Sequence, residues 1–237
     1  PEGFRAHGKK GSATPKSHTM TGEALPAYGT GGFLPKMQEL GIVATRNSRE
    51  ARFEEADRIS GQALASGRLV GKDGCLSCPI RCGRVVELDG RQVKGPELET
   101  LVLLGSNLGN GDMDRIIEWN VQLDELGLDT MTAGSTIAFA MELADRGLAE
   151  FPVKFGETDA VSGLIDDIAH RRGFGDELAE GTKRLAARYG ASEAPLHAHG
   201  LQLARPQPRP APGPGPRHPP SHPGPSPPPR ATPAPPR

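Results

Sequence analysis

The sequence predicts a mainly α-helical domain that carries a cysteine loop and a small hairpin and is followed by a disordered, proline-rich tail. Three observations lead to this fold class. Four segments between residues 111 and 190 have helical periodicity and end at a glycine. All three cysteines of the 237-residue chain lie within eight residues of one another. Finally, 16 of the 24 prolines follow Ala204.

The composition divides the chain into three parts. Residues 1–35 are rich in Gly, Ser, Thr and Lys and lack periodicity, so we expect a loop or the end of a missing N-terminal domain. The chain opens with Pro1 rather than Met, which we interpret as the mark of a fragment. Residues 36–204 form the predicted helical domain. Residues 205–237 cannot bury enough apolar surface to offset chain entropy, and we predict that they are disordered.

The charge changes at the same boundary. The chain has 28 Lys and Arg against 29 Asp and Glu, and five of the arginines lie in the acid-free tail. The remaining body is therefore mildly acidic, which argues against nucleic acid as a partner. The sequence has no apolar run of membrane-spanning length and no signal-peptide pattern at its start, so we expect no membrane partner.

The first half of the helical domain contains a predicted helix and a predicted hairpin. Phe53, Ala56, Ile59 and Ala63 recur at helical intervals within residues 48–67, which end at a glycine. Residues 83–95 alternate like strands around an Asp-Gly turn at positions 89 and 90, which indicates a small hairpin.

The second half consists of four predicted helices, each with an apolar face and a closing glycine. They span residues 112–127, 132–147, 160–173 and 175–190. Asp112 stands where an N-terminal cap is expected for the first of them. Short connections between the four favour an α-helical domain.

Cys75, Cys78 and Cys82 form a Cys-x2-Cys-x3-Cys loop, which is typical of metal or cluster ligands. Thiolates presented from a compact loop suit an iron–sulfur cluster. The competing interpretations are a structural zinc site with a distant histidine as fourth ligand, and three free thiols. Clustered cysteines also favour a reducing compartment, so we predict a cytoplasmic location.

Three long motifs give a more specific signal than the cysteines alone. GCLSCPIRCGRV (residues 74–85), GPELETLVLLGSNLG (95–109) and LDELGLDTMTAGSTIAFAMELADRG (123–147) closely resemble aldehyde ferredoxin oxidoreductases in content, order and distance. Two further segments, at residues 41–50 and 173–190, are similar to the family as well. The resemblance covers roughly residues 30–200.

The resemblance implies two cofactors and their residues. Three cysteines of the family's loop bind a [4Fe-4S] cluster, which assigns Cys75, Cys78 and Cys82 as ligands. The family's Asp-x-x-Gly-Leu-Asp/Cys motif binds one pterin of a bis-pterin centre that holds tungsten or molybdenum. Here that motif has four cofactor-binding candidates: Asp124, Gly127, Leu128 and Asp129. Taken alone, the same motif would be an ordinary helix end with solvated carboxylates.

The resemblance also implies a reaction. Glu99 in GPELE is similar to the family's carboxylate near the metal, and its implied catalytic role is to accept a proton. Aldehydes would be oxidised to carboxylic acids, and the electrons would pass through the cluster to ferredoxin. The family also allows a homo-oligomer. The non-catalytic alternative is a helical module that binds zinc or an iron–sulfur cluster for interaction or electron transfer.

The sequence departs from the family pattern in two places. The fourth cluster cysteine and the second pterin motif have no counterpart in the chain, so we expect the isolated chain to be inactive. The resemblance fades after about Leu196, and the composition then changes abruptly to Pro, Arg, Ala and Gly. We hypothesise a shifted reading frame from about Arg205, which resequencing of the gene would test.

Overall fold

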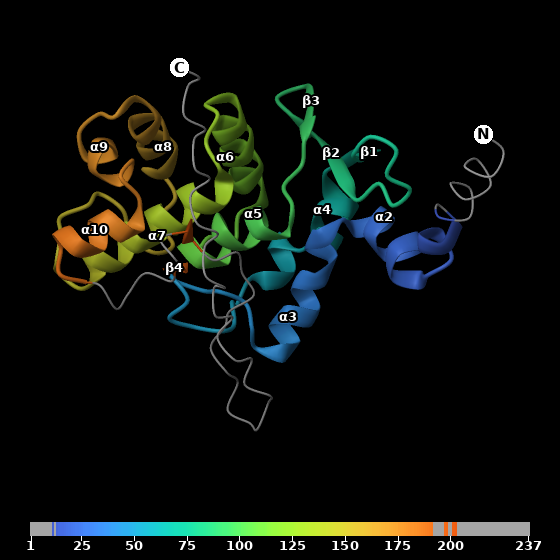
Figure 1. The fold of residues 1–237 in the computed structure, drawn as a ribbon, viewed down its shortest axis with the longest axis horizontal. Coiled ribbons are helices and arrows are strands. Elements are labelled where there is room, and N and C mark those ends of the chain that lie inside the picture. The colour runs from blue at the N-terminus through green and yellow to red at the C-terminus, as the bar shows by residue number, and fades with distance from the viewer. Residues whose placement is uncertain (1–10, 12, 192–196, 199–200, 203–237) are drawn as a thin grey trace, which may run out of the picture.

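The computed structural model describes residues 11, 13–191, 197–198 and 201–202, and in this part the chain is mainly helical, with one small three-stranded sheet at its side (Figure 1). The predicted fold class is confirmed for the described part. The predicted disordered tail at 205–237 lies outside the described residues. A short antiparallel pair, β4 (His197–Ala198) and β5 (Leu201–Gln202), is the last described feature.

Of the two alternatives for residues 1–35, the end of a missing domain stays a prediction, whereas a loop is wrong for most of residues 19–35, which form consecutive helical turns. The turns are Thr19–Ala24, α2 (Leu25–Tyr28), Thr30–Phe33 and α3 (Leu34–Leu40). Prolines at positions 26 and 35 occupy the first turns of α2 and α3, where their fixed φ favours helix and no donor is lost. The elements are too short for periodicity to reveal them.

The predicted helix over residues 48–67 is only half correct. Its second half contains the helical turn Ala56–Ile59 and α4 (Gly61–Gly67), and Ser60 caps α4 by accepting from the Ala63 amide at 3.1 Å. The first half is irregular, and the chain enters it through Arg46, Asn47 and Ser48, which all have φ between 46° and 61°. These residues turn the chain between the bridged pair Thr45 and Glu50.

The predicted hairpin is confirmed as β2 (Gly83–Leu88) and β3 (Arg91–Lys94), joined through the positive-φ turn Asp89-Gly90. The structure adds a strand that the sequence did not indicate, β1 (Leu69–Asp73), which pairs antiparallel with β2. Its last pair joins Asp73 to Gly83. The cysteine loop is therefore the connection between two paired strands.

The second half contains the predicted helices, with changes at their ends. They are α6 (Met113–Glu125), α7 (Thr130–Asp145) and α8 (Val161–His170). Arg171 in the left-handed conformation closes α8, two residues before the predicted glycine. The last predicted helix is divided into two helices, α9 (Phe174–Leu178) and α10 (Thr182–Arg188), because Gly181 between them has a φ of 79°. None of the helices in the described part combines the length and apolarity needed to cross a bilayer.

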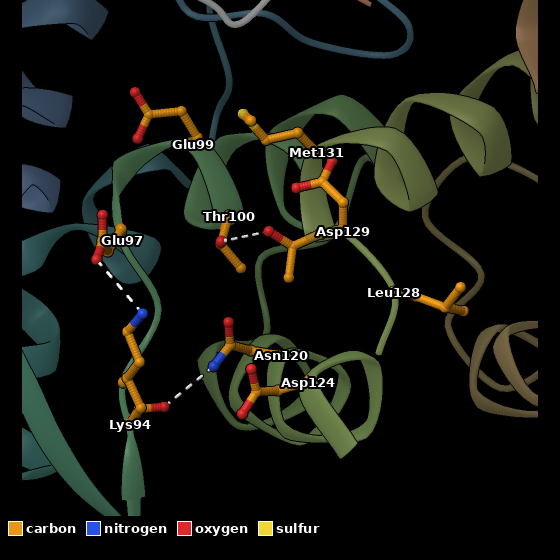
Figure 2. A pocket seen from close by; sticks show the side chains of 11 residues that line it. Lys94, Glu97, Glu99, Thr100, Asn120, Asp124, Leu128, Asp129 and Met131 are labelled. Atoms are coloured by element: carbon orange, nitrogen blue, oxygen red, sulfur yellow. Dashed lines mark hydrogen bonds and ion pairs between the residues drawn. The ribbon is translucent and has the colours of Figure 1, made fainter. Parts of the chain in front are cut away.

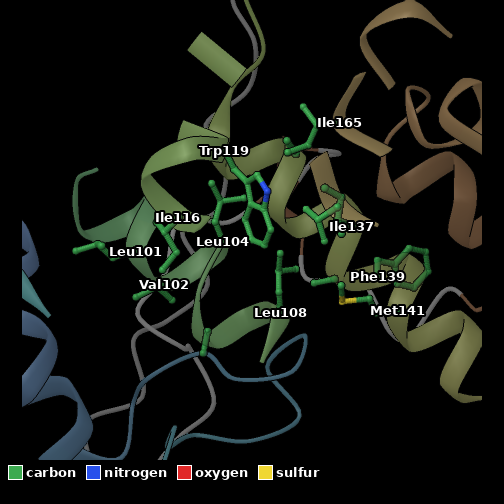
Figure 3. Close-up of a cluster of buried hydrophobic side chains, with 14 of the residues drawn as sticks. Leu101, Val102, Leu104, Leu108, Ile116, Trp119, Ile137, Phe139, Met141 and Ile165 are labelled. Atoms are coloured by element: carbon green, nitrogen blue, oxygen red, sulfur yellow. The ribbon is translucent and has the colours of Figure 1, made fainter. Parts of the chain in front are cut away.

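A further helix, α5 (Leu98–Leu103), packs against α6 and α7 and was not expected from the sequence. Five of its six residues are buried, so it lacks the polar face that marks an amphipathic helix. Trp119 of α6 is fully buried among aliphatic side chains from α5, α7 and α8 (Figure 3). Its indole Nε1 donates to Ser162 Oγ at 2.8 Å, which fixes α6 against α8.

Candidate functional site

A cavity of about 540 Å³ opens where the end of β3, the start of α5, one face of α6 and the start of α7 meet. Its lining residues are Lys94, Gly95, Glu97, Glu99, Thr100, Asn120, Asp124, Leu128, Asp129, Thr130 and Met131. Figure 2 shows Glu99 and Met131 on one side of this pocket and Asn120 and Asp124 on the other. Four of the predicted site residues therefore share one cavity, although they come from two motifs separated in sequence.

Glu99 lies in the first turn of α5 and is half-buried at the pocket wall. The other carboxylate of GPELE, Glu97, is exposed and lies 3.8 Å from the Lys94 ammonium. The amide of Leu98 between them donates to Thr30 Oγ1 at 3.0 Å, which anchors the entry of α5. Among the described residues Lys94 pairs with Glu97 rather than with Glu99, so Glu99 is better placed than Glu97 to meet a ligand.

Asp129 caps the N-terminus of α7. One carboxylate oxygen, Oδ2, accepts from the Thr132 amide at 2.7 Å. The side chain is exposed at the pocket, so the remaining acceptor capacity of the carboxylate is available to a ligand. Asp124, in the last turn of α6, is exposed at the same pocket.

Gly127 does not line this pocket, unlike the candidates Asp124, Leu128 and Asp129 of the same motif. Its φ of 69° ends α6, and the Leu128 amide then donates back to the Leu123 carbonyl at 2.8 Å. Gly127 lines a second cavity of about 390 Å³ on the other side of Leu128 and Asp129. Its observed role is to turn the chain so that Leu128 and Asp129 stand at the first pocket.

The sequence did not single out Lys94, Thr100, Asn120 or Thr130 as pocket residues. Asn120 Nδ2 donates to the Lys94 carbonyl at 3.0 Å and joins α6 to the end of β3 (Figure 2). The signal for Asn120 was its spacing, because a residue four before Asp124 shares a helix face with it. Lys94 carried no local signal, since only the hairpin geometry brings it to the pocket.

The cysteine loop, residues 74–82, projects from the β1–β2 end of the sheet. Cys75 is exposed, whereas Cys78 and Cys82 are half-buried. The Cys78 amide donates to the Cys75 carbonyl at 3.0 Å, so the first two cysteines are held in one turn. Backbone N–H groups of Arg81 and Ile80 lower the pKa of the Cys78 thiol, which favours the thiolate that metals bind.

The described residues contain no group of three His, Cys, Asp or Glu side chains close enough to hold a single metal ion. The ligands of a [4Fe-4S] cluster each bind a different iron and stand farther apart than those of one ion. The donor set fits such a cluster: three thiols on one loop, one of them with a lowered pKa, and a buried arginine two residues after the third cysteine with an unpartnered Nε.

The pocket also fits the chemistry of a pterin. Its volume is that of a small-molecule site, and its wall offers carboxylates from Asp124 and Asp129 that can accept from ring N–H groups. The cysteine loop and the pocket lie at the same open end of the β2–β3 hairpin, opposite its Asp89-Gly90 turn, because the loop enters β2 and the residues after β3 line the pocket.

Comparison with known proteins gives one family model and several relatives. Residues 7–225 match the family model for aldehyde ferredoxin oxidoreductase, domains 2 and 3. A tungsten-containing aldehyde ferredoxin oxidoreductase of Pyrococcus abyssi is 43% identical over 188 residues, which are 75% of this chain and 31% of the relative. The enzyme of the same name from Thermococcus kodakarensis is 39% identical over 196 residues, 79% of this chain and 32% of the relative.

Among solved structures, the active site complex BamBC of benzoyl coenzyme A reductase, in complex with 1,5-dienoyl-CoA, has a TM-score of 0.53. The match covers 65% of this chain and 24% of that chain at 23% identity, so it shows a shared fold alone. The chain spans about a third of the length of the curated relatives it matches. From the family model and the identity to these relatives, the chain belongs to the aldehyde ferredoxin oxidoreductase family.

Proposed function

We propose that this chain is part of an aldehyde:ferredoxin oxidoreductase that oxidises aldehydes to carboxylic acids at a tungsten or molybdenum bis-pterin centre. The observation that carries the proposal is the convergence of GPELE and DELGLD on one pocket, with Glu99, Asp124 and Asp129 in its wall. The tungsten-containing relatives support the cofactor assignment. When bound, the metal–pterin group supplies the two-electron oxidation of the aldehyde.

In that proposal the residues of this chain bind and orient the cofactor. The carboxylates of Asp124 and Asp129 accept hydrogen bonds from the N–H groups of one pterin, and charge assistance strengthens such bonds. Conversion of an aldehyde and water into a carboxylic acid releases two electrons and two protons. Glu99, at the opposite wall from Asp124, accepts one of these protons.

Cys75, Cys78 and Cys82 hold three irons of a [4Fe-4S] cluster that passes the electrons to ferredoxin. This region supplies three of the four implied ligands and one of the two implied pterin motifs. We therefore expect the 237-residue chain alone to bind a cluster and not to turn over aldehyde. The cytoplasmic location remains a prediction that rests on the clustered cysteines.

Metal analysis after anaerobic purification tests the proposal. Iron and acid-labile sulfide in comparable amounts, lost when Cys75, Cys78 and Cys82 are replaced by Ser, support it. Detection of tungsten or molybdenum together with released pterin would also support the proposed metal–pterin cofactor. Zinc without iron would contradict it and favour the non-catalytic zinc-binding module.

A further inference from the structure

Arg84 is a buried arginine next to the cysteine loop. It lies on β2, two residues after Cys82, and is 3% exposed. Its guanidinium is bonded to backbone carbonyls: Nη1 donates to Pro26 and Ala27 at 2.9 Å each, and Nη2 donates to Arg81 at 3.0 Å. All its acceptors within the described structure are backbone carbonyls, so the charge has no direct ion-pair partner there.

The remaining donor of this side chain, Nε–H, is buried without a hydrogen-bond partner among the described residues. An unsatisfied donor on a charged group costs free energy, and native structures keep few of them without a reason. The Nε–H of Arg84 is therefore a buried donor that no hydrogen bond of the described residues satisfies.

Gly29 lies close to both this side chain and the cysteine loop. A Cβ on Gly29 would lie 3.1 Å from the Cys82 carbonyl oxygen and 3.4 Å from Arg84 Nε. The Cys82 backbone and the unpartnered Nε thus flank the same point at the end of α2. On the other side, the Arg84 carbonyl accepts from the Gly95 amide at 2.9 Å, and Gly95 lines the pocket.

We propose that Arg84 is a positioning residue for the cluster: its Nη groups fasten the cysteine loop to α2, and its Nε–H donates to a sulfur acceptor when a cluster is bound. This role rests on the proposed function, because it needs the cluster that the cysteines are proposed to hold. A hydrogen bond and a positive charge at the sulfurs stabilise the more negative, reduced form of a cluster. Arg84 therefore raises the reduction potential of the cluster and slows its loss.

The test compares Arg84→Lys and Arg84→Gln with wild-type chain and with Arg81→Gln. Arg81 is the matched control, because it is an exposed arginine of the same loop whose Nη2 donates only at 3.3 Å to the Lys72 carbonyl. Each 237-residue chain is reconstituted anaerobically with iron, sulfide and a small thiol for the fourth iron. Iron and sulfide per chain, the rate of iron loss to a chelator, and the midpoint potential of the reduced-state EPR signal are measured.

We expect both Arg84 variants to lose iron several-fold faster than wild type and to shift the midpoint to lower potential. Arg84→Gln should shift it further than Arg84→Lys, because Lys keeps the charge without the Nε–H. Arg81→Gln should match wild type. Circular dichroism of the apo chains checks folding, and Arg84→Lys decides the matter if Arg84→Gln does not fold.

The positioning role would be overturned if both Arg84 variants had the same midpoint potential and iron-loss rate as Arg81→Gln. That result would leave the cluster assignment intact. A wild-type chain that takes up no iron would instead contradict the proposed function itself. The two failures are therefore distinguishable.

Discussion

The hydroxyls of Thr100 and Thr130 lie 2.9 Å apart and join the first turn of α5 to the first turn of α7 (Figure 2). Glu99 precedes the first threonine and Asp129 precedes the second. This single hydrogen bond therefore ties together the two helix starts that present the GPELE and DELGLD carboxylates to one pocket.

Thr100→Val should lower the free energy of unfolding by about 1 kcal/mol, because the isosteric change leaves the Thr130 hydroxyl without its partner. Thr130→Val should cost a similar amount. The double variant should cost less than the sum of the two, which urea denaturation of all four chains would show. Strict additivity would mean that the two hydroxyls do not interact.

Asp129 should have two separable roles, as the cap of α7 and as a ligand carboxylate. Asp129→Ala should lower stability by about 1 kcal/mol and weaken pterin binding, whereas Asp129→Asn should keep the cap and weaken binding by about tenfold. Thermal unfolding and the fluorescence of a titrated pterin, 6-hydroxymethylpterin, measure the two effects.

Asp112 provides the control for this experiment. It caps α6 by accepting from the Asp114 amide at 2.9 Å, and it does not line the pocket. Asp112→Ala should therefore match Asp129→Ala in lost stability and bind pterin like wild type. Equal pterin affinity in wild type, Asp129→Asn and Asp112→Ala would contradict the ligand role of Asp129.

Gly134 on α7 allows the close approach of α5. A Cβ at this position would lie 2.7 Å from the Leu103 carbonyl oxygen. Gly134→Ala should therefore destabilise the chain by about 1–3 kcal/mol despite the better helix propensity of alanine. Gly163→Ala on α8 is the control, since nothing lies within 4 Å of its added Cβ, and it should stabilise by about 0.5–1 kcal/mol.

Denaturation midpoints of the two glycine variants give the comparison directly. Equal effects at both positions would show that the α5–α7 contact is not tight. A loss at Gly134 alone would confirm that the pocket wall depends on this helix pair.

The sequence predicted the motifs of the candidate site, but not how the structure brings them together in one cavity. The helix bearing Asp124 and the turn at Gly127 could be predicted, because a strong amphipathic pattern ends there at a residue that tolerates positive φ. Helix α5 could not, because five of its six residues are buried and the binary pattern disappears. Placement of Glu99 in a helical turn therefore came only from the structure.

Other differences have equally local causes. The irregular segment at Arg46, Asn47 and Ser48 is stabilised by contacts distant in sequence: the Asn47 amide donates to the Asn107 carbonyl at 3.0 Å, and its side chain donates to the buried Glu142 at 2.5 Å. No pattern within residues 41–50 records such partners. Strand β1 was not predicted because Gly71 interrupts its pattern at a register shift.

The Arg68–Asp114 pair should make a small, pH-dependent contribution. Arg68 donates through Nε and Nη2 to the two Asp114 oxygens at 2.6 and 2.7 Å, and its side chain lowers the pKa of Asp114 below 3.8. A lowered native pKa gives stability that is present above the unfolded value and is lost as the pH falls through the native one. Because both side chains are largely exposed, the effect should not exceed about 1 kcal/mol.

Urea denaturation at about pH 7 should therefore show Asp114→Asn to be slightly less stable than wild type. As the pH falls through the lowered native pKa of Asp114, the difference should shrink towards zero, because the wild-type carboxyl is then increasingly protonated. A difference that persists unchanged at low pH would place the cause outside this ion pair.

The central claim is that Glu99 serves aldehyde oxidation at the pocket formed by GPELE and DELGLD. It is tested most directly in an enzyme in which the matching segment of the Pyrococcus abyssi relative is replaced by this region, with a viologen dye as electron acceptor. Glu97→Gln is the matched control, since Glu97 is an exposed neighbour paired with Lys94 at the rim.

We predict that the graft oxidises aldehydes, that Glu99→Gln lowers the rate by about 10²-fold or more with unchanged metal content and thermal stability, and that Glu97→Gln stays within a few-fold of the unsubstituted graft. A graft with full metal content that oxidises no aldehyde, or a Glu99→Gln variant as active as Glu97→Gln, would contradict the account.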